Sequence, residues 1–400
     1  MKKVTIILFL IILFSFNPFL VNSQNSQNIT VSFCGDPVSL HIDSSLTVKF
    51  DASLSKETIQ AFYTQLNSGN YKPLVSALLD YKDQHQLNDW LYYQLIRRTA
   101  QQISPKAENY YRYTLYKWFL LTKSGYNASL AIGQDRLLFY VQSNDNIYDI
   151  PLYLRGGKQY VCLNYHDYGY IDFEKEKMFE TYIEVPEAQN AFSYKVTNLP
   201  DFKSNVYAEK NISFQYKQKI RHYKLALNTQ VQAMFTNYPG VDFESYFNIP
   251  MSTKTYSSLI PVLRKDMQGM NQKNGIEYLM QFTRNAFGYA NDQSAFGKEK
   301  RLSPEQTLQY SYSDCDDRSG LFFYLVKEIY DLPMIVLVYP AHVTIAVKLD
   351  KPVGDAIVYN GEKYSVCEPT PQGMELKVGE ILPALKKTAY DVVYAYHPNK

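Results

Sequence analysis

The chain has 400 residues, of which 46% are hydrophobic and 20% are charged, as is usual for a globular protein of two or three domains. A formal net charge of +2 over this length gives no electrostatic basis for nucleic-acid binding, so no nucleic-acid partner is expected. The 4 cysteines are too few for a disulfide scaffold. If one bridge forms, Cys34 and Cys162 are the expected pair.

Residues 1–23 have the pattern of a secretory signal peptide. Lys2 and Lys3 precede an apolar run, and the small residues of Val21-Asn22-Ser23 favour cleavage after Ser23. The alternative is an uncleaved N-terminal anchor. Because no later segment is long and apolar enough to span a bilayer, we expect a periplasmic or secreted protein with no stable membrane span after cleavage.

Residues 24–200 are predicted to form an α+β region. Strands are expected at 29–33 and 39–50, followed by mostly helices from 53 to 126 and by strands from 129 onward. The clearest patterns are the helices 73–79, 90–101 and 109–124 and the strands 129–132, 136–142 and 160–164. The 37 Tyr of the chain either line a sugar-binding or peptide-binding cleft or fill half-exposed strand faces.

Residues 201–245 are predicted to be a β-rich connection, because strand patterns continue from 179 to about 235. They are clearest at 214–216 and 222–231. The pattern turns helical from 256 to 287, where one buried face is expected to hold Leu259, Val262, Leu263 and Met267. Residues 246–400 form the last predicted domain.

Cys315 is predicted to start a buried helix. It follows Ser313 and Asp314, either of which is a good N-cap residue, and it precedes apolar residues at helical spacing. The helix dipole and the free backbone N–H groups at this end stabilise a thiolate. Asp314, Asp316 and Asp317 act in the opposite direction and raise the thiol pKa unless a nearby cation offsets them.

His342 and Glu368 are predicted to lie on neighbouring antiparallel strands. His342 opens the strand 342–347, and Glu368 ends the strand 364–368, which follows the strong hairpin signal Asn360-Gly361. The order of helix-start Cys, strand-start His and strand-end acid fits a catalytic triad. In that triad Cys315 is the nucleophile, His342 is the general base and Glu368 is the orienting acid.

Three motifs carry a family resemblance. They are Asp314-Cys315-Asp316-Asp317-Arg318-Ser319, then Ala341-His342-Val343, then Cys367-Glu368-Pro369-Thr370. In this order they resemble the transglutaminase-like superfamily, most closely its exported bacterial members known as transglutaminase-like cysteine peptidases. The upstream Phe287-Gly288-Tyr289 is similar to the lead-in of that group. The resemblance covers about residues 250–390.

The resemblance implies a C-terminal papain-like α+β core, with the nucleophile on a central helix packed against an antiparallel sheet. It implies a cysteine peptidase or amidase that acts on a peptide or protein through a thioester, with no cofactor and no metal. One alternative is a protein-glutamine transamidase, and another is a non-catalytic binding or scaffold protein. The family's usual third residue is Asp, whereas Glu368 stands here. The oxyanion hole would use the Cys315 N–H and a second donor, for which Gln309 and Tyr312 are candidates.

The segment from Tyr110 to Asn164 parallels the segment from Cys315 to Glu368, with a helix followed by similar strands. The positions matching the triad fall near Tyr110, Phe139, and Leu163 or Asn164, so this segment lacks the chemistry. It is either a degenerate second copy of the fold or a chance similarity of helix-then-strands.

Overall fold

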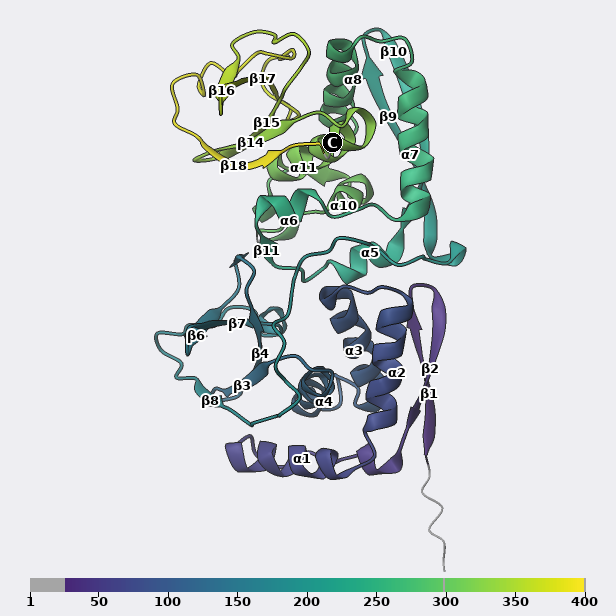
Figure 1. The fold of residues 1–400 in the computed structure, drawn as a ribbon, viewed down its shortest axis with the longest axis vertical. Coiled ribbons are helices and arrows are strands. Elements are labelled where there is room, and N and C mark those ends of the chain that lie inside the picture. Colours follow the sequence, from purple (N-terminus) through teal and green to yellow (C-terminus); the bar gives the residue numbers. More distant parts are fainter. Residues whose placement is uncertain (1–25, 298, 399–400) are drawn as a thin grey trace, which may run out of the picture.

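The computed structural model describes residues 26–297 and 299–398, so the expected signal peptide lies outside the described residues. The described chain is a mixed α+β protein with eleven α-helices and several antiparallel sheets, two of which curl into half-barrels. Figure 1 shows two lobes stacked along the long axis, the N-terminal lobe below and the C-terminal lobe above. None of the helices in these residues is long and apolar enough to cross a membrane.

The N-terminal lobe consists of a hairpin, four helices and a five-stranded sheet. The hairpin is β1 (Gln27–Phe33) with β2 (Asp36–Ile42), and the helices are α1 (Lys56–Ser68), α2 (Lys72–Gln84), α3 (Asp89–Ile103) and α4 (Tyr110–Lys123). The sheet has the order β6-β7-β4-β3-β8, with bounds Leu152–Arg155, Lys158–Cys162, Leu137–Ser143, Ala128–Ile132 and Phe179–Thr181.

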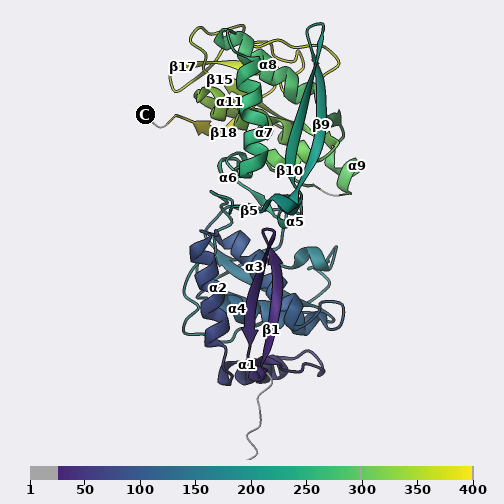
Figure 2. The same ribbon diagram turned by 90° about the vertical axis from the view of Figure 1, so that its right-hand side faces the viewer.

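The C-terminal lobe repeats this sequence of elements. Its hairpin is β9 (Tyr207–Tyr216) with β10 (Lys219–Asn228), and its main helices are α7 (Thr253–Asp266), α8 (Gln272–Asn285) and α11 (Cys315–Tyr330). Its sheet has the order β16-β17-β15-β14-β18, with bounds Ile357–Tyr359, Glu362–Cys367, His342–Val347, Met334–Tyr339 and Asp391–Tyr396. Figure 2 shows the two hairpins one above the other on the same side of the molecule.

Short elements join the lobes and lead to α11. β11 (Gly240–Val241) pairs with β5 (Ile147–Tyr148) of the N-terminal lobe and thereby ties the two lobes together. The others are α5 (Thr229–Met234), α6 (Phe243–Phe247), β12 (Gly288–Tyr289), α9 (Asp292–Phe296), α10 (Pro304–Gln309) and β13 (Tyr312–Ser313). β12 and β13 pair in parallel just before α11 begins.

The two five-stranded sheets have the same topology, since β3, β4, β6, β7 and β8 occupy the places of β14, β15, β16, β17 and β18. Their tight turns also match. β6 and β7 are joined by Gly156-Gly157, as β16 and β17 are joined by Asn360-Gly361, and all four turn residues have positive φ. Such φ values are those of a two-residue hairpin turn, which favours Gly and Asn.

Most of the expected elements are confirmed, but three expectations are wrong. The strand expected at 39–50 ends at Ile42, because Asp43 caps a short 3₁₀ turn over Ser44–Leu46. Strands were expected to continue from 179 to about 235, but residues 182–203 contain none, and β10 ends at Asn228 because Thr229–Met234 form α5. Val262 is 40% exposed, because Leu259, Ile260 and Leu263 already occupy the buried face of α7.

The expected bridge between Cys34 and Cys162 is also wrong, since both thiols are free. Cys34 lies in the β1–β2 turn and Cys162 ends β7 in the sheet. Figure 1 shows helices of the lobe between the hairpin and the sheet, which explains why the two side chains do not meet. Burial raises the pKa of each thiol to about 12.

Candidate functional site

Cys315 is the first residue of α11, as the sequence predicts. Asp314 is the N-cap, and its Oδ1 accepts from the backbone N–H groups of Asp316 and Asp317 at 3.1 and 3.2 Å. This capping satisfies two of the helix's free N–H groups. The Cys315 side chain is left half-buried at the helix start.

The residues after Cys315 fasten the helix to its surroundings. Asp317 is fully buried and accepts from the backbone N–H of Leu302 at 2.8 Å and from the hydroxyl of Tyr246 at 3.1 Å. Ser319 donates its hydroxyl to the carbonyl of Val343 at 3.0 Å, which links the first turns of α11 to β15 beside His342.

Arg318 is fully buried and serves as a clamp on the end of α8. Its guanidinium donates to the carbonyls of Thr283, Arg284, Phe287 and Gly288 at 2.7–3.0 Å. Thr283 and Arg284 belong to the last turn of α8, where helix carbonyls lack partners of their own, and Phe287 and Gly288 follow the helix. Arg318 therefore fixes both α8 and the segment that leads into β12 against the Cys315 helix.

His342 and Glu368 form a direct pair, as predicted. Nε2 of His342 lies 2.7 Å from Oε2 of Glu368, and the other carboxylate oxygen accepts from the backbone N–H of Thr370 at 2.9 Å. Arg284 donates to the carbonyls of Glu368 and Leu376. The Glu368 side chain is thus anchored at both carboxylate oxygens.

The protonation of His342 is set by opposing effects. Burial disfavours the imidazolium, but the hydrogen bond to Glu368, the charge of Glu368 and the charge of Asp316 outweigh it. Together they raise the pKa of His342 above its ordinary value. Since Nε2 is bound to Glu368, Nδ1 is the ring nitrogen left for a second partner.

The thiol of Cys315 has a carboxylate as its partner. Sγ lies 3.4 Å from Oδ1 of Asp316, and burial together with the charges of Asp316 and Asp314 raises the thiol pKa above its ordinary value. The backbone N–H of Val343 acts in the opposite direction. Among the described residues, no hydrogen bond joins Cys315 to His342.

The three predicted site residues are distributed over the two faces of the sheet that contains β15 and β17. His342 and Glu368 lie on the same face as Ala346 and Val366, which belong to the core inside the curled sheet. The α11 helix packs on the other face. Cys315 lies near the start of β15, where the backbone N–H of Val343 acts on its thiol, and the charge of Asp316 acts on both Cys315 and His342.

A group of carboxylates lies beside Cys315. Oxygen atoms of Asp292, Glu299 and Asp314 lie within 4.8 Å of one another, and burial and mutual repulsion raise the pKa of Asp292 to about 6 and that of Asp314 to about 7. Within the described ranges this is the set of side chains that could share a metal ion, and its oxygen ligands suit a hard cation such as Ca²⁺. The three residues are spread over 23 positions of the sequence, so no short sequence motif predicts this group.

The oxyanion-hole candidates differ from those expected. Gln309 donates its amide to the carbonyl of Asn228, and Tyr312 is 55% exposed and makes no hydrogen bond to Cys315 among the described residues. Tyr289 belongs to the lead-in segment Phe287-Gly288-Tyr289, but the sequence did not single it out as an oxyanion-hole donor. Its side chain is 52% exposed, and burial together with the charge of Cys315 raises the pKa of its hydroxyl. The parallel pairing of Tyr289 with Ser313 brings it to the segment just before Cys315, and such a non-local pairing leaves no sequence signal.

The chain matches no family model, and no curated protein or solved structure is significantly similar to it. The candidate site is therefore judged by the chemistry of Cys315, His342 and Glu368 and of the groups around them.

Proposed function

We propose that the chain is an exported thiol acyl-transfer enzyme of the transglutaminase-like kind, a cysteine peptidase or amidase with a papain-like core in residues 246–400. The observation that carries the proposal is the pair of His342 and Glu368, 2.7 Å apart, at the sheet edge next to the helix-start Cys315. An acid-bound imidazole beside a helix-start thiol is the arrangement that cysteine acyl transfer uses.

In the proposed reaction, the thiol proton of Cys315 passes to Nδ1 of His342 while Sγ attacks the carbonyl carbon of a peptide-type amide. The Glu368 carboxylate stabilises the imidazolium that forms. The C–N bond then breaks, His342 returns the proton to the leaving amine, and a thioester remains on Cys315. Water activated by the same imidazole hydrolyses the thioester and restores the thiol.

The negative charge on the carbonyl oxygen needs donors in this reaction. The backbone N–H of Cys315 is at the open end of α11, where helix N–H groups are free to bind an anion. We assign the second donor to the hydroxyl of Tyr289, because its strand β12 pairs with β13 shortly before Cys315.

We also propose that the N-terminal lobe is a second copy of the same unit that lacks the site. The equal strand order and the matching two-residue turns support this. The turns align Arg136 with His342 and Asn164 with Glu368, and the helix caps Asn109 and Asp314 align Tyr110 with Cys315. None of Tyr110, Arg136 and Asn164 can supply a triad.

A non-catalytic protein that keeps the fold is the second candidate. The raised pKa of Cys315 and its carboxylate partner Asp316 favour it, because a reactive cysteine normally has a lowered pKa. Transamidation remains the alternative outcome of the proposed chemistry, since it shares every step up to the thioester and differs only in the acceptor.

The test is the rate at which iodoacetamide modifies Cys315 near neutral pH, read by peptide mass spectrometry. The mature protein is compared with His342→Ala and with Cys367→Ala, which removes a buried free thiol that has no part in the site. The proposal expects His342→Ala to slow the modification about ten-fold or more, because the base is lost. A rate that is the same with and without His342 would favour the non-catalytic candidate.

A further inference from the structure

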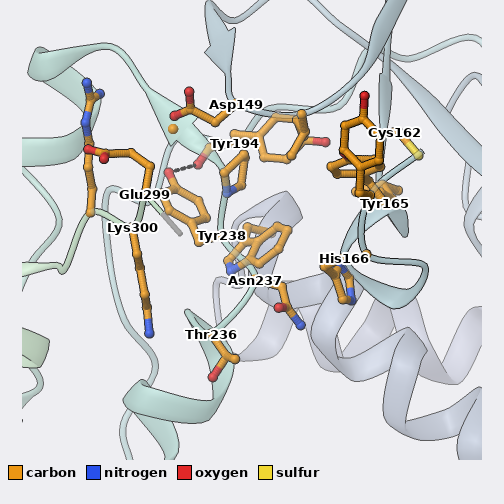
Figure 3. Close-up of a pocket in the computed structure, with 18 of the residues that line it drawn as sticks. Asp149, Cys162, Tyr165, His166, Tyr194, Thr236, Asn237, Tyr238, Glu299 and Lys300 are labelled. Atoms are coloured by element: carbon orange, nitrogen blue, oxygen red, sulfur yellow. Dashed lines mark hydrogen bonds between the residues drawn. The ribbon is translucent and has the colours of Figure 1, made fainter. Parts of the chain in front are cut away.

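A cavity of about 500 Å³ lies where the two lobes meet (Figure 3). The N-terminal lobe supplies Trp90, Tyr165, His166 and Tyr194. The connecting segment adds Asn237 and Tyr238, and the C-terminal lobe closes one side with Glu299, Lys300 and Arg301. Its size is that of a site for a small ligand rather than for a single water molecule.

The aromatic wall of this cavity is held in place by its own contacts. The ring of Trp90 lies 5.2 Å from that of Tyr238 and 5.9 Å from that of Tyr194, measured between centroids. Trp90 donates its Nε1–H to the carbonyl of Met234, and Tyr238 donates its hydroxyl to the carbonyl of Tyr194. The wall is therefore rigid before any ligand arrives, which lowers the entropic cost of binding.

Tyr194, which lines this cavity, has a fully buried side chain whose hydroxyl has no hydrogen-bond partner among the described residues. Nε2 of His166, another residue of the wall, lies 3.3 Å from Oδ1 of Asp167. Most buried tyrosine hydroxyls in the lobe core are bonded, for example that of Tyr116 to the carbonyl of Leu46. A buried polar group without a partner costs about 1–3 kcal/mol, so the hydroxyl of Tyr194 is a group that a ligand can satisfy.

The charges around the cavity narrow the class of ligand. Lys300 bonds the hydroxyl of Tyr310, and Arg301 bonds the carbonyl of Val241 and lies 3.7 Å from Asp316. The cations of the wall are thus engaged elsewhere, whereas the carboxylates of Asp149 and Glu299 remain at the rim. An anionic ligand such as a phosphate is disfavoured by these acids.

We propose that this cavity binds a carbohydrate of one or two sugar units. The C–H faces of a sugar ring pack on aromatic side chains, and its hydroxyl groups both donate and accept hydrogen bonds. The unpartnered hydroxyl of Tyr194, the amide of Asn237 and the rim carboxylates match such a neutral, polyhydroxylated ligand. Part of the tyrosine excess of the chain then lines a sugar site.

The cavity also lies next to the proposed catalytic site. Arg301 belongs to its wall and approaches Asp316, which in turn contacts the thiol of Cys315. A glycosylated peptide is therefore the substrate class that fits both sites together. This extension rests on the proposed function, whereas sugar binding in the cavity does not depend on it.

The test is sugar binding by the mature Cys315→Ala protein, measured by calorimetry and by the fluorescence of Trp90. The probes are N-acetylglucosamine, its β-1,4-linked dimer, cellobiose and maltose, with trialanine as a peptide probe. At least one sugar is expected to bind with a Kd of about 1 mM or tighter. Tyr194→Phe, which removes only the unpartnered hydroxyl, is expected to weaken that binding about ten-fold.

Tyr93→Phe is the matched control. The hydroxyl of Tyr93 is also buried and without a partner, but Tyr93 does not line the cavity, so sugar binding should not change. Asn237→Ala, at the half-buried rim, is a second variant in case Tyr194→Phe perturbs the core, and it should also weaken binding. The proposal is overturned if no sugar binds at about 10 mM, if both variants bind as tightly as the parent, or if trialanine binds instead.

Discussion

The two lobes share an architecture and differ in what stands at one place in it. Each has a hairpin, helices, a capped helix and a five-stranded sheet with the same strand order. In the C-terminal lobe that place holds Cys315, His342 and Glu368, and in the N-terminal lobe it holds Tyr110, Arg136 and Asn164. The comparison shows that the helix caps and the hairpin turns maintain the fold whether or not the Cys, His and Glu side chains are present.

In the N-terminal lobe, the side chains at the matching positions are bonded to one another or to neighbouring carboxylates. Nδ2 of Asn164 donates to the hydroxyl of Tyr110 at 2.8 Å, and this hydroxyl donates to Asp167 at 2.9 Å. Arg136 points instead to Glu176. In the C-terminal lobe the thiol of Cys315 bonds Asp316, and among the described residues Nδ1 of His342 has no hydrogen-bond partner. A ring nitrogen that is left open in this way can serve a reaction.

Arg318→Ala should have the largest effect on stability. It removes a buried clamp from four carbonyls, and we expect the free energy of unfolding to fall by about 3 kcal/mol or more, measured by urea denaturation. Arg112→Ala in the N-terminal lobe is the control, because its guanidinium is partly exposed and pairs with Glu108 at the surface. A loss for Arg318→Ala no larger than for Arg112→Ala would contradict the clamp.

Asn164→Ala and Glu368→Gln should distinguish the structural role of the matching position in the N-terminal lobe from the chemical role of Glu368 in the C-terminal lobe. Asn164 is fully buried and bonds Tyr110, Leu137 and Phe139, so its truncation should cost about 2 kcal/mol of stability. Glu368→Gln keeps the shape and should cost less than half as much, but it should abolish the His342-dependent part of Cys315 alkylation. Equal stability losses, with alkylation unchanged in both variants, would mean that both places are purely structural.

The pH dependence of stability should reveal the pair of His342 and Glu368. The folded state raises the pKa of His342, so protonation of His342 stabilises the fold. This contribution is fully present below the ordinary value of 6.5 and is lost as the pH rises through the higher folded value. The difference in unfolding free energy between the parent and His342→Gln should therefore be larger at about pH 5 than at about pH 9. If the difference in unfolding free energy does not change with pH, the pair of His342 and Glu368 does not stabilise the fold.

Asp316→Asn should have the smallest effect on stability but a clear effect on Cys315. Removing the carboxylate that contacts Sγ should lower the thiol pKa and raise the alkylation rate near neutral pH several-fold. Asp355→Asn, at an exposed surface position far along the chain, is the control and should change nothing. If Asp316→Asn leaves the rate unchanged, Asp316 is not the group that holds the proton on the thiol.

Much of the fold follows from local sequence signals. Helical spacing predicted α4, α7 and α8, the Asn360-Gly361 turn predicted the β16–β17 hairpin, and strand alternation put His342 and Glu368 on one face. The capping pattern predicted the start of α11 at Cys315 with Ser313 or Asp314 as the N-cap, and in the structure Asp314 is the N-cap.

The rest depends on contacts between distant segments. The Arg318 clamp, the pairing of β12 with β13 and the pairing of β5 with β11 each join parts of the chain that carry no shared pattern. The carboxylate partner of the thiol is different, because Asp316 is adjacent to Cys315, and only the rotamer decides whether it faces the sulfur.

The central claim is tested most directly by trapping the thioester. The mature protein is mixed with p-nitrophenyl acetate and its intact mass and peptide map are recorded, beside Cys315→Ala and His342→Ala. We predict one acetyl group on Cys315, formed rapidly, absent in Cys315→Ala and strongly reduced in His342→Ala. Acetylation that is spread over surface lysines, with no dependence on Cys315 or His342, would contradict the acyl-transfer function.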